Sequence, residues 1–102
     1  MTDEKKPLQT EIKIEIDEQT SNGVYSNLFL ISNAETEFTM DFIFFQPQHA
    51  KAKVRSRIIT SPSHAKRILA ALQDNIAKYE AQFGTIKDSS LQIQEQKPKF
   101  YN

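Results

Sequence analysis

The fold is decided by residues 37–62, which read EFTMDFIFFQPQHAKAKVRSRIITSP. The first part of this stretch places phenylalanine or methionine at every second position, which is the period of a β-strand that buries one face. Pro47 cannot donate to a backbone ladder, so pairing should stop there, and a second strand begins at Lys51. The loop between the two has hairpin length. We therefore predict an antiparallel hairpin of two long strands.

A hairpin that is symmetric about Gln48 fixes the pairing of its side chains. Phe44 then lies opposite Ala52, so that a large side chain faces a small one. On the other face Asp41 lies opposite Arg55, and the two charges attract each other. Volume and charge therefore predict the same register.

Two more strands are expected before the hairpin. Residues 8–16 alternate mainly isoleucine with glutamine, glutamate and lysine, a pattern typical of a half-buried strand. Residues 17–23, DEQTSNG, concentrate turn formers. Residues 24–32 are apolar on both faces, as in a central strand or in one buried against another subunit.

A long helix follows the hairpin. Ser61 and Pro62 are the residue types expected at the N-cap and the first helical position, and Gly84 is a stop signal. Between them an apolar stripe recurs at spacings of 4, 3, 4, 3 and 4 residues and consists of Ala65, Leu69, Leu72, Ile76, Tyr79 and Phe83. We expect the stripe to pack mainly against its own sheet, while a rod of about 33 Å also has the length to contact a second copy.

The sequence thus predicts an α+β fold of order β-β-β-β-α, in which a four-stranded antiparallel meander precedes one long C-terminal helix. One helix covers only one face of a sheet, and apolar residues remain on the other, so we expect a homodimer. A single domain should span residues 8–86, between a flexible N-terminus at residues 1–7 and a disordered tail at residues 87–102.

Composition excludes several classes of site. The 102 residues include no cysteine, and 13 basic residues balance 13 acidic ones. Disulfides and thiol nucleophiles are therefore excluded. The N-terminus lacks the apolar segment of a signal peptide, and the longest apolar runs are too short to cross a membrane. The sequence predicts a cytoplasmic protein.

No motif supports catalysis. His49 and His64 lie 15 residues apart without a metal-binding motif, and two glycines cannot build a phosphate-cradling loop. Asp41 and Glu37 lie about 13 Å apart along one strand and face cations, which favours salt bridges over an acid–base pair. We predict a protein that is not an enzyme and that needs no metal or cofactor.

The basic residues are concentrated in one segment. Residues 51–67 contain six of them and no acid, so a net charge of zero does not exclude an anionic partner. Alternation predicts that the first four share one strand face at intervals of about 6–7 Å, close to the phosphate spacing of an extended nucleic-acid strand. Aromatic side chains on neighbouring strands can stack on bases. The predicted binding residues for single-stranded DNA or RNA are Lys51, Lys53, Arg55, Arg57, Phe45 and Tyr25.

Two other interpretations stay open. A row of cations also guards an exposed sheet edge against aggregation. Alternatively, the chain is a protein-binding adaptor or chaperone-like oligomer that uses an apolar sheet face made of Phe29, Ile31, Ile43 and Phe45. Phosphate binding weakens steeply with salt and apolar association does not, so salt dependence separates these functions.

Two resemblances bear on these predictions. GVYSNLFLISNAETEFTMDFIFFQP at residues 23–47 and KAKVRSRIITSPSHAKRILAALQDNIAKYEAQFG at residues 51–84 resemble a small prokaryotic family known as domain of unknown function 3467. The signals are its G-x-Y-x-N entry, E-F-x-x-D-F strand, K-A-K-V-x-S-R-I strand and H-A-K-R helix start. That family implies no activity and no catalytic residues. The topology alone is also similar to the Whirly, Pur-alpha and p15 coactivator group, which implies dimers formed through the helix and single strands bound on the sheet.

Overall fold

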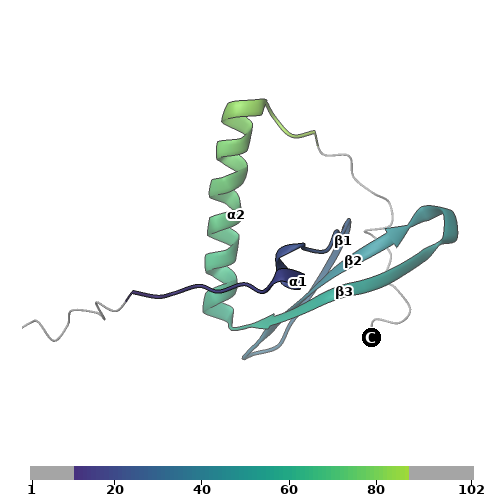
Figure 1. Cartoon of the computed structure of the whole chain (residues 1–102), viewed down its shortest axis with the longest axis horizontal. Helices are drawn as coiled ribbons and strands as arrows, with labels where there is room; N and C mark the ends of the chain where they lie inside the picture. Colours follow the sequence, from purple (N-terminus) through teal and green to yellow (C-terminus); the bar gives the residue numbers. More distant parts are fainter. Residues whose placement is uncertain (1–10, 88–102) are drawn as a thin grey trace, which may run out of the picture.

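The computed structural model of the chain describes residues 11–87 and confirms the α+β class (Figure 1). Its elements, in chain order, are α1 (Glu18–Ser21), β1 (Leu28–Asn33), β2 (Phe38–Gln46), the 3-10 turn η2 (Pro47–His49), β3 (Lys51–Thr60) and α2 (Pro62–Phe83). The strands form one antiparallel sheet in the order β1-β2-β3. The predictions for residues 1–7 and 88–102 lie outside the described residues.

The fourth strand expected over residues 8–16 is not found in the part that the structure describes. Residues 11–16 carry no strand assignment, and Ile12, Ile14 and Ile16 are 86%, 88% and 64% exposed. Alternation is necessary for a half-buried strand but does not itself supply a neighbouring strand. Within the described residues the sheet therefore has three strands.

The turn formers that follow build a short helix rather than an open turn. Asp17 caps α1, and its carboxylate accepts a hydrogen bond from the Thr20 backbone N–H at 2.9 Å. Hydrogen bonds from Thr20, first its side chain and then its backbone, lower the pKa of the Asp17 carboxyl below its ordinary value. Gly23 then takes a φ of 74°, which costs glycine little and turns the chain toward the sheet.

The β2–β3 hairpin forms, but its register differs from the predicted one. Gln46 pairs with Lys51, and Phe44 lies opposite Lys53 rather than opposite Ala52. The reason is the turn, which closes through the 3-10 turn η2 and through Ala50 in the left-handed region at a φ of 50°. The pairing is therefore displaced by one residue from a loop centred on Gln48.

A bulge in β3 displaces the register by one further residue. Ile43 pairs with Val54 and Phe42 pairs with Ser56, so Arg55 has no opposite residue on β2. A bulge reverses the face on which the following side chains of that strand lie. Beyond it, Asp41 lies opposite Arg57 and not opposite Arg55.

The core of the described chain is small. Its buried apolar side chains are Leu28, Met40 and Ile43, and Ile43 is completely buried. Asp41 is also completely buried, and its carboxylate accepts hydrogen bonds from Arg57 Nε at 2.7 Å and from Arg57 Nη2 at 2.9 Å. A two-point bond of this kind is short, charge-assisted and geometrically specific. It fastens β2 to β3 at the centre of the sheet.

Local signals place α2 where the sequence predicts it. Ser61 is the N-cap, and its hydroxyl accepts a hydrogen bond from His64 N–H at 3.1 Å. Pro62 opens the helix, and Gly84 ends it with a φ of 101° while its N–H donates to the Glu80 carbonyl. These boundaries depend on neighbouring residues only, which explains their agreement with the sequence.

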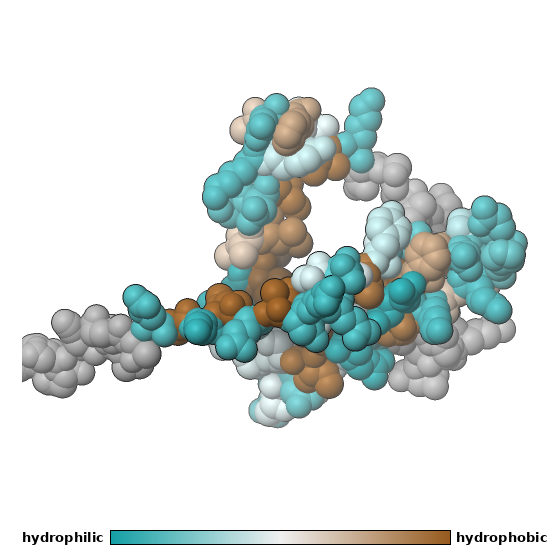
Figure 2. All heavy atoms as spheres, in the orientation of Figure 1, coloured by the Kyte–Doolittle hydropathy of each residue, from teal (hydrophilic) through white to brown (hydrophobic). Residues whose placement is uncertain are grey.

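The expected packing of α2 against its own sheet is wrong. None of its 22 residues is buried, and the large side chains of the stripe, from Leu69 to Phe83, are 39–65% exposed. In Figure 1 the helix rises away from the end of β3, and the extensive contacts are those within the sheet. Figure 2 shows the hydrophobic atoms of α2 on the flank turned toward the sheet, with hydrophilic atoms outside. The stripe therefore lacks a packing partner among the described residues.

The ion pair predicts unequal effects for two neighbouring arginines. Arg57→Gln removes two charge-assisted bonds from a buried carboxylate and should lower the free energy of unfolding by about 2–3 kcal/mol. Arg55→Gln changes an exposed bulge residue and should cost less than about 0.5 kcal/mol. Urea denaturation at equal protomer concentrations measures both. Equal losses would contradict the structural role of Arg57.

Candidate nucleic-acid interface

The bulge divides the basic residues of β3 between the two faces of the sheet. Residues that pair across strands share a face, so Lys53 lies on the face of Phe44, and Lys51 lies on the same face. Arg57 shares the opposite face with Asp41. Arg55 occupies the bulge between them. The single row of four cations that alternation predicts is therefore wrong.

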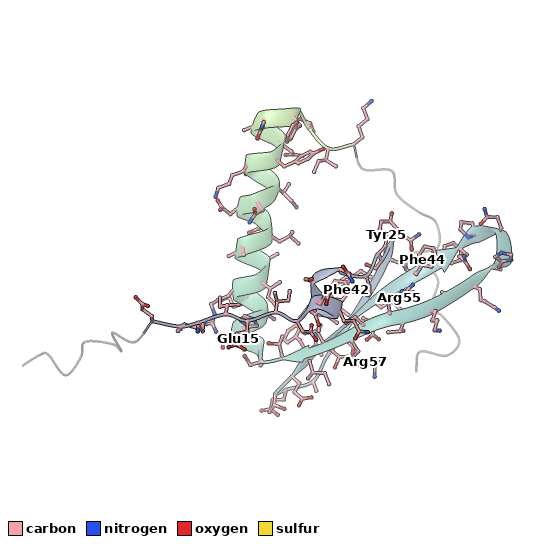
Figure 3. The ribbon with its side chains drawn as sticks, in the orientation of Figure 1. Glu15, Tyr25, Phe42, Phe44, Arg55 and Arg57 are labelled. Carbon is pink, nitrogen blue, oxygen red and sulfur yellow. The ribbon has the colours of Figure 1, made fainter. Side chains whose placement is uncertain are left out.

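Aromatic side chains gather beside the two lysines. The rings of Tyr25 and Phe44 meet edge to face with centroids 6.1 Å apart, and Phe29 and Phe42 form a second pair at 5.1 Å. Phe29 pairs with Phe42 across the strands, so this aromatic row lies on the Lys53 face. Figure 3 shows Tyr25 and Phe44 together above the sheet and Arg57 below β3. We name the surface of Lys51, Lys53, Tyr25, Phe44, Phe29 and Phe42 the basic aromatic face.

One predicted aromatic residue lies elsewhere. Phe45 pairs with Ala52 and therefore lies on the face opposite Lys53. Phe44 takes the position that the sequence assigned to Phe45. The displaced register causes the exchange, because a shift of one residue moves every side chain to the other face. No residue type signals the left-handed conformation of Ala50 that closes the turn, so the sequence pattern could not have identified Phe44.

Asn27 positions the aromatic pair. Its side-chain amide donates to the Phe45 carbonyl at 3.0 Å and accepts from the Phe45 N–H at 2.8 Å, in the manner of a paired strand residue. Its own backbone N–H donates to the Ile43 carbonyl at 2.9 Å. These bonds fix the segment before β1 beside the end of β2, where Tyr25 reaches Phe44. The G-x-Y-x-N motif therefore consists of a turn glycine, a face residue and a clamp.

The basic aromatic face is partly exposed, since Phe42 and Phe44 are half-buried, and it carries positive charge. Tyr25 is 71% exposed, and both lysines are exposed. Among the described residues no carboxylate forms an ion pair with Lys51, Lys53 or Arg55, whereas Arg57 is bonded to Asp41. Lys51 and Lys53 lie two residues apart on one strand, a backbone spacing of about 6–7 Å, so their side chains can contact successive phosphates of an extended strand. The aromatic rings beside them offer surfaces for base stacking.

The apolar face suggested for a protein partner is also reduced. Ile43 is completely buried, and Phe45 lies on the face opposite Phe29. Phe29 and Ile31 remain 46% and 49% exposed, and Ile58 on β3 joins them at 45%. An apolar patch therefore borders the aromatic row on the same face.

Other kinds of site find little support in the described part of the chain. Residues 11–87 contain no cluster of three or more histidine or acidic side chains that could hold a metal ion. None of the helices found there has the length and apolarity needed to cross a bilayer.

The Asn27 clamp predicts a local loss of order. Asn27→Ala removes two hydrogen bonds and should lower the free energy of unfolding by about 1–2 kcal/mol. The Phe45 amide should exchange faster with solvent, because its hydrogen-bond acceptor is lost. Asn33→Ala, at the other end of β1, is the control and should leave that exchange rate unchanged. Amide exchange followed by NMR distinguishes the two, and a protected Phe45 amide in Asn27→Ala would contradict the clamp.

Comparison with known proteins assigns the chain to a family. Searches of curated proteins and of solved structures return no match. The model of one family, described as protein of unknown function (DUF3467), matches residues 1–88. This match spans all the described helices and strands, including the clamp, the ion pair and the basic aromatic face. The chain therefore belongs to the DUF3467 family.

Proposed function

We propose that this protein is a small homo-oligomeric binding protein, without enzymatic activity, that binds single-stranded DNA or RNA on the basic aromatic face. The observation that carries the proposal is that Lys51 and Lys53, which form no ion pair with the described residues, share one sheet face with the exposed rings of Tyr25 and Phe29 and the partly exposed rings of Phe42 and Phe44. Single strands are recognised in this way, because phosphates need cations and unstacked bases need flat apolar partners. Double-stranded DNA hides its bases within the stack and would use the lysines alone.

The expected energetics are modest. Base–aromatic stacking contributes about 1–3 kcal/mol for each base. Two lysines contact about two phosphates, whereas the uninterrupted row of the sequence prediction would have contacted four. One protomer should therefore bind weakly, and a dimer that presents two faces would gain affinity through linkage of the two sites. Oligomerisation and binding are thus connected in this proposal.

The α2 stripe supports a homodimer. Its 4, 3, 4, 3, 4 spacing is the heptad repeat of a two-stranded coiled coil. Its side chains remain exposed, and a few buried apolar residues make a small core for the described chain. Small chains with little buried surface commonly gain stability from a partner subunit. A second α2 is the partner that this repeat fits.

Volume and charge favour antiparallel pairing of the two helices. When the two-fold axis passes beside Asp74, a small side chain lies opposite a large one at each end of the helix pair. Ala65 then faces Phe83 of the other copy. It also sets Lys66 near Glu80 of the other copy on both sides of the dyad. Parallel pairing would oppose Phe83 to Phe83 and would leave Lys66 without that partner. Unlike charges at flanking positions set orientation in coiled coils.

Charge exchange tests the helix pairing. Glu80→Lys places like charges together twice and should weaken dimerisation about tenfold. The single change also removes the bond that Glu80 accepts from the Ile86 N–H, so the decisive variant is the double one. Lys66→Glu with Glu80→Lys should restore the dissociation constant measured by sedimentation equilibrium. A stable monomer of 11.8 kDa in the native protein at micromolar concentration would contradict the dimer.

A matched pair of double variants tests nucleic-acid binding. Lys51→Gln with Lys53→Gln should weaken binding to labelled single-stranded oligonucleotides of every sequence. It should also reduce the slope of log affinity against log salt by about 1.4, since each phosphate contact on a single strand contributes about 0.7. Arg67→Gln with Lys78→Gln makes the same charge change on the outer side of α2 and should leave the slope unchanged. Electrophoretic shift at several salt concentrations measures both variants.

The second candidate function is a protein-binding adaptor, favoured by the exposed patch of Phe29, Ile31 and Ile58. Binding through this patch would persist or strengthen at high salt. If the native protein shows no salt-sensitive binding to oligonucleotides, the nucleic-acid proposal fails and the apolar patch becomes the leading candidate.

A further inference from the structure

The segment of residues 11–17, EIKIEID, resembles a strand without a sheet, and we name it the arm. Its three isoleucines share one side of an extended chain and are 64–88% exposed. A contiguous apolar row of this kind is unfavourable in water and marks an interaction site. Its other side alternates three acids with one base, a net charge of −2.

The chain's own sheet does not receive the arm. No backbone hydrogen bond joins residues 11–16 to another element within the described residues. Figure 1 shows the arm leaving α1, passing the base of α2 and running away from the sheet. Asp17 caps α1 at the point where the arm begins, so the direction of departure is fixed by a defined helix start. The arm is therefore unpaired within the described residues.

The outer edge of β3 has the complementary pattern. β3 pairs only with β2 among the described strands, so its other side offers free backbone donors and acceptors. Its first residues alternate as the arm does, with Lys51 and Lys53 on one face and half-exposed Ala52 and Val54 on the other. The other edge strand, β1, contains no charged residue. Charge complementarity therefore selects β3.

We propose that the arm of one copy adds as a fourth strand to the β3 edge of a second copy. Backbone hydrogen bonds would supply affinity, and alternate side chains would supply specificity, as in other cases of strand addition. The arm isoleucines would cover Ala52 and Val54, and the other side of the arm, with its net charge of −2, would lie along the face of Lys51 and Lys53. The exchange is reciprocal, so two copies form a closed two-fold pair. The fourth strand that alternation predicts is then contributed by the partner.

This arrangement goes beyond oligonucleotide binding and adds a constraint on it. The arm acids and a phosphate backbone would compete for the same two lysines. Arm exchange does not require nucleic acid, and it does not require the α2 pairing. Experiments can therefore contradict arm exchange, oligonucleotide binding or α2 pairing without contradicting the other two.

The absence of cysteine makes a direct test simple. Isotopically heavy Ile14→Cys protein is mixed with light Val54→Cys protein, and separately with light Ala52→Cys protein, and a short bismaleimide joins nearby thiols. Mass spectrometry should find heavy arm peptides linked to light β3 peptides. The control partner is Ala70→Cys, which is exposed on the outer side of α2 and should link at least tenfold less. Linkage to β3 no greater than to Ala70→Cys would overturn the proposal.

A double-Cys chain separates exchange from pairing within one copy. Light Ile14→Cys/Val54→Cys protein that is unfolded and refolded together with its heavy form should give light–heavy links between arm and β3, in the proportion expected when light and heavy chains pair at random. Links confined to light–light and heavy–heavy peptides would mean that each arm folds onto its own β3, and the exchange would be wrong.

Charge reversal gives an independent readout without cysteines. Glu11→Lys with Glu15→Lys should raise the dimer dissociation constant about tenfold, and Lys51→Glu with Lys53→Glu in the same chain should restore it. Glu35→Lys with Glu37→Lys, in the exposed β1–β2 connection, is the matched control and should have little effect. Equal effects of the two reversals, or no rescue, would contradict the proposed pairing of the arm with β3.

Discussion

The structure depends on one ion pair. Asp41 is completely buried at the centre of the sheet. Arg57, on the neighbouring strand, donates two hydrogen bonds to its carboxylate. A buried charge that lost this partner would be costly, so the pair permits one register of β2 against β3. The bulge at Arg55 then follows, because the turn and the ion pair require registers that differ by one residue. The turn sets Lys51 and Lys53 on the aromatic face, and the bulge moves Arg57 to the other face.

Several surfaces of the described chain lack a packing partner. Three of its surfaces lack the neighbour that their pattern predicts: the α2 stripe, the isoleucine row of the arm and the free edge of β3. Each of these patterns is characteristic of a buried element, and none is buried within the described residues. A second copy would supply an antiparallel helix to the stripe and an acidic strand to the basic edge. A single assumption, self-association, thus accounts for all three.

Features set by interactions between neighbouring residues were predictable from the sequence, whereas features set by distant contacts were not. The limits of α2 were predictable because Ser61, Pro62 and Gly84 act on adjacent backbone groups. The hairpin was predictable from alternation, but its register was not, because a left-handed Ala50 and a bulge at Arg55 carry no distinctive residue type. The position of α2 was not predictable, since a stripe for its own sheet and a stripe for a partner have the same spacing. For the candidate site, the sequence grouped Lys51, Lys53 and Tyr25 on one face, as the structure does, but it placed Phe45 where the structure has Phe44.

We propose that the register of β2 against β3 places a single-strand binding surface on the face of Phe44. NMR titration with a short thymidine oligonucleotide tests it most directly, because each face is reported by its own residues. If the strand binds on this face, we expect chemical-shift changes at Lys51, Lys53, Tyr25 and Phe44, with upfield shifts of the base protons stacked on the rings. Changes centred on Arg57 and Phe45, or no change at low salt, would contradict it.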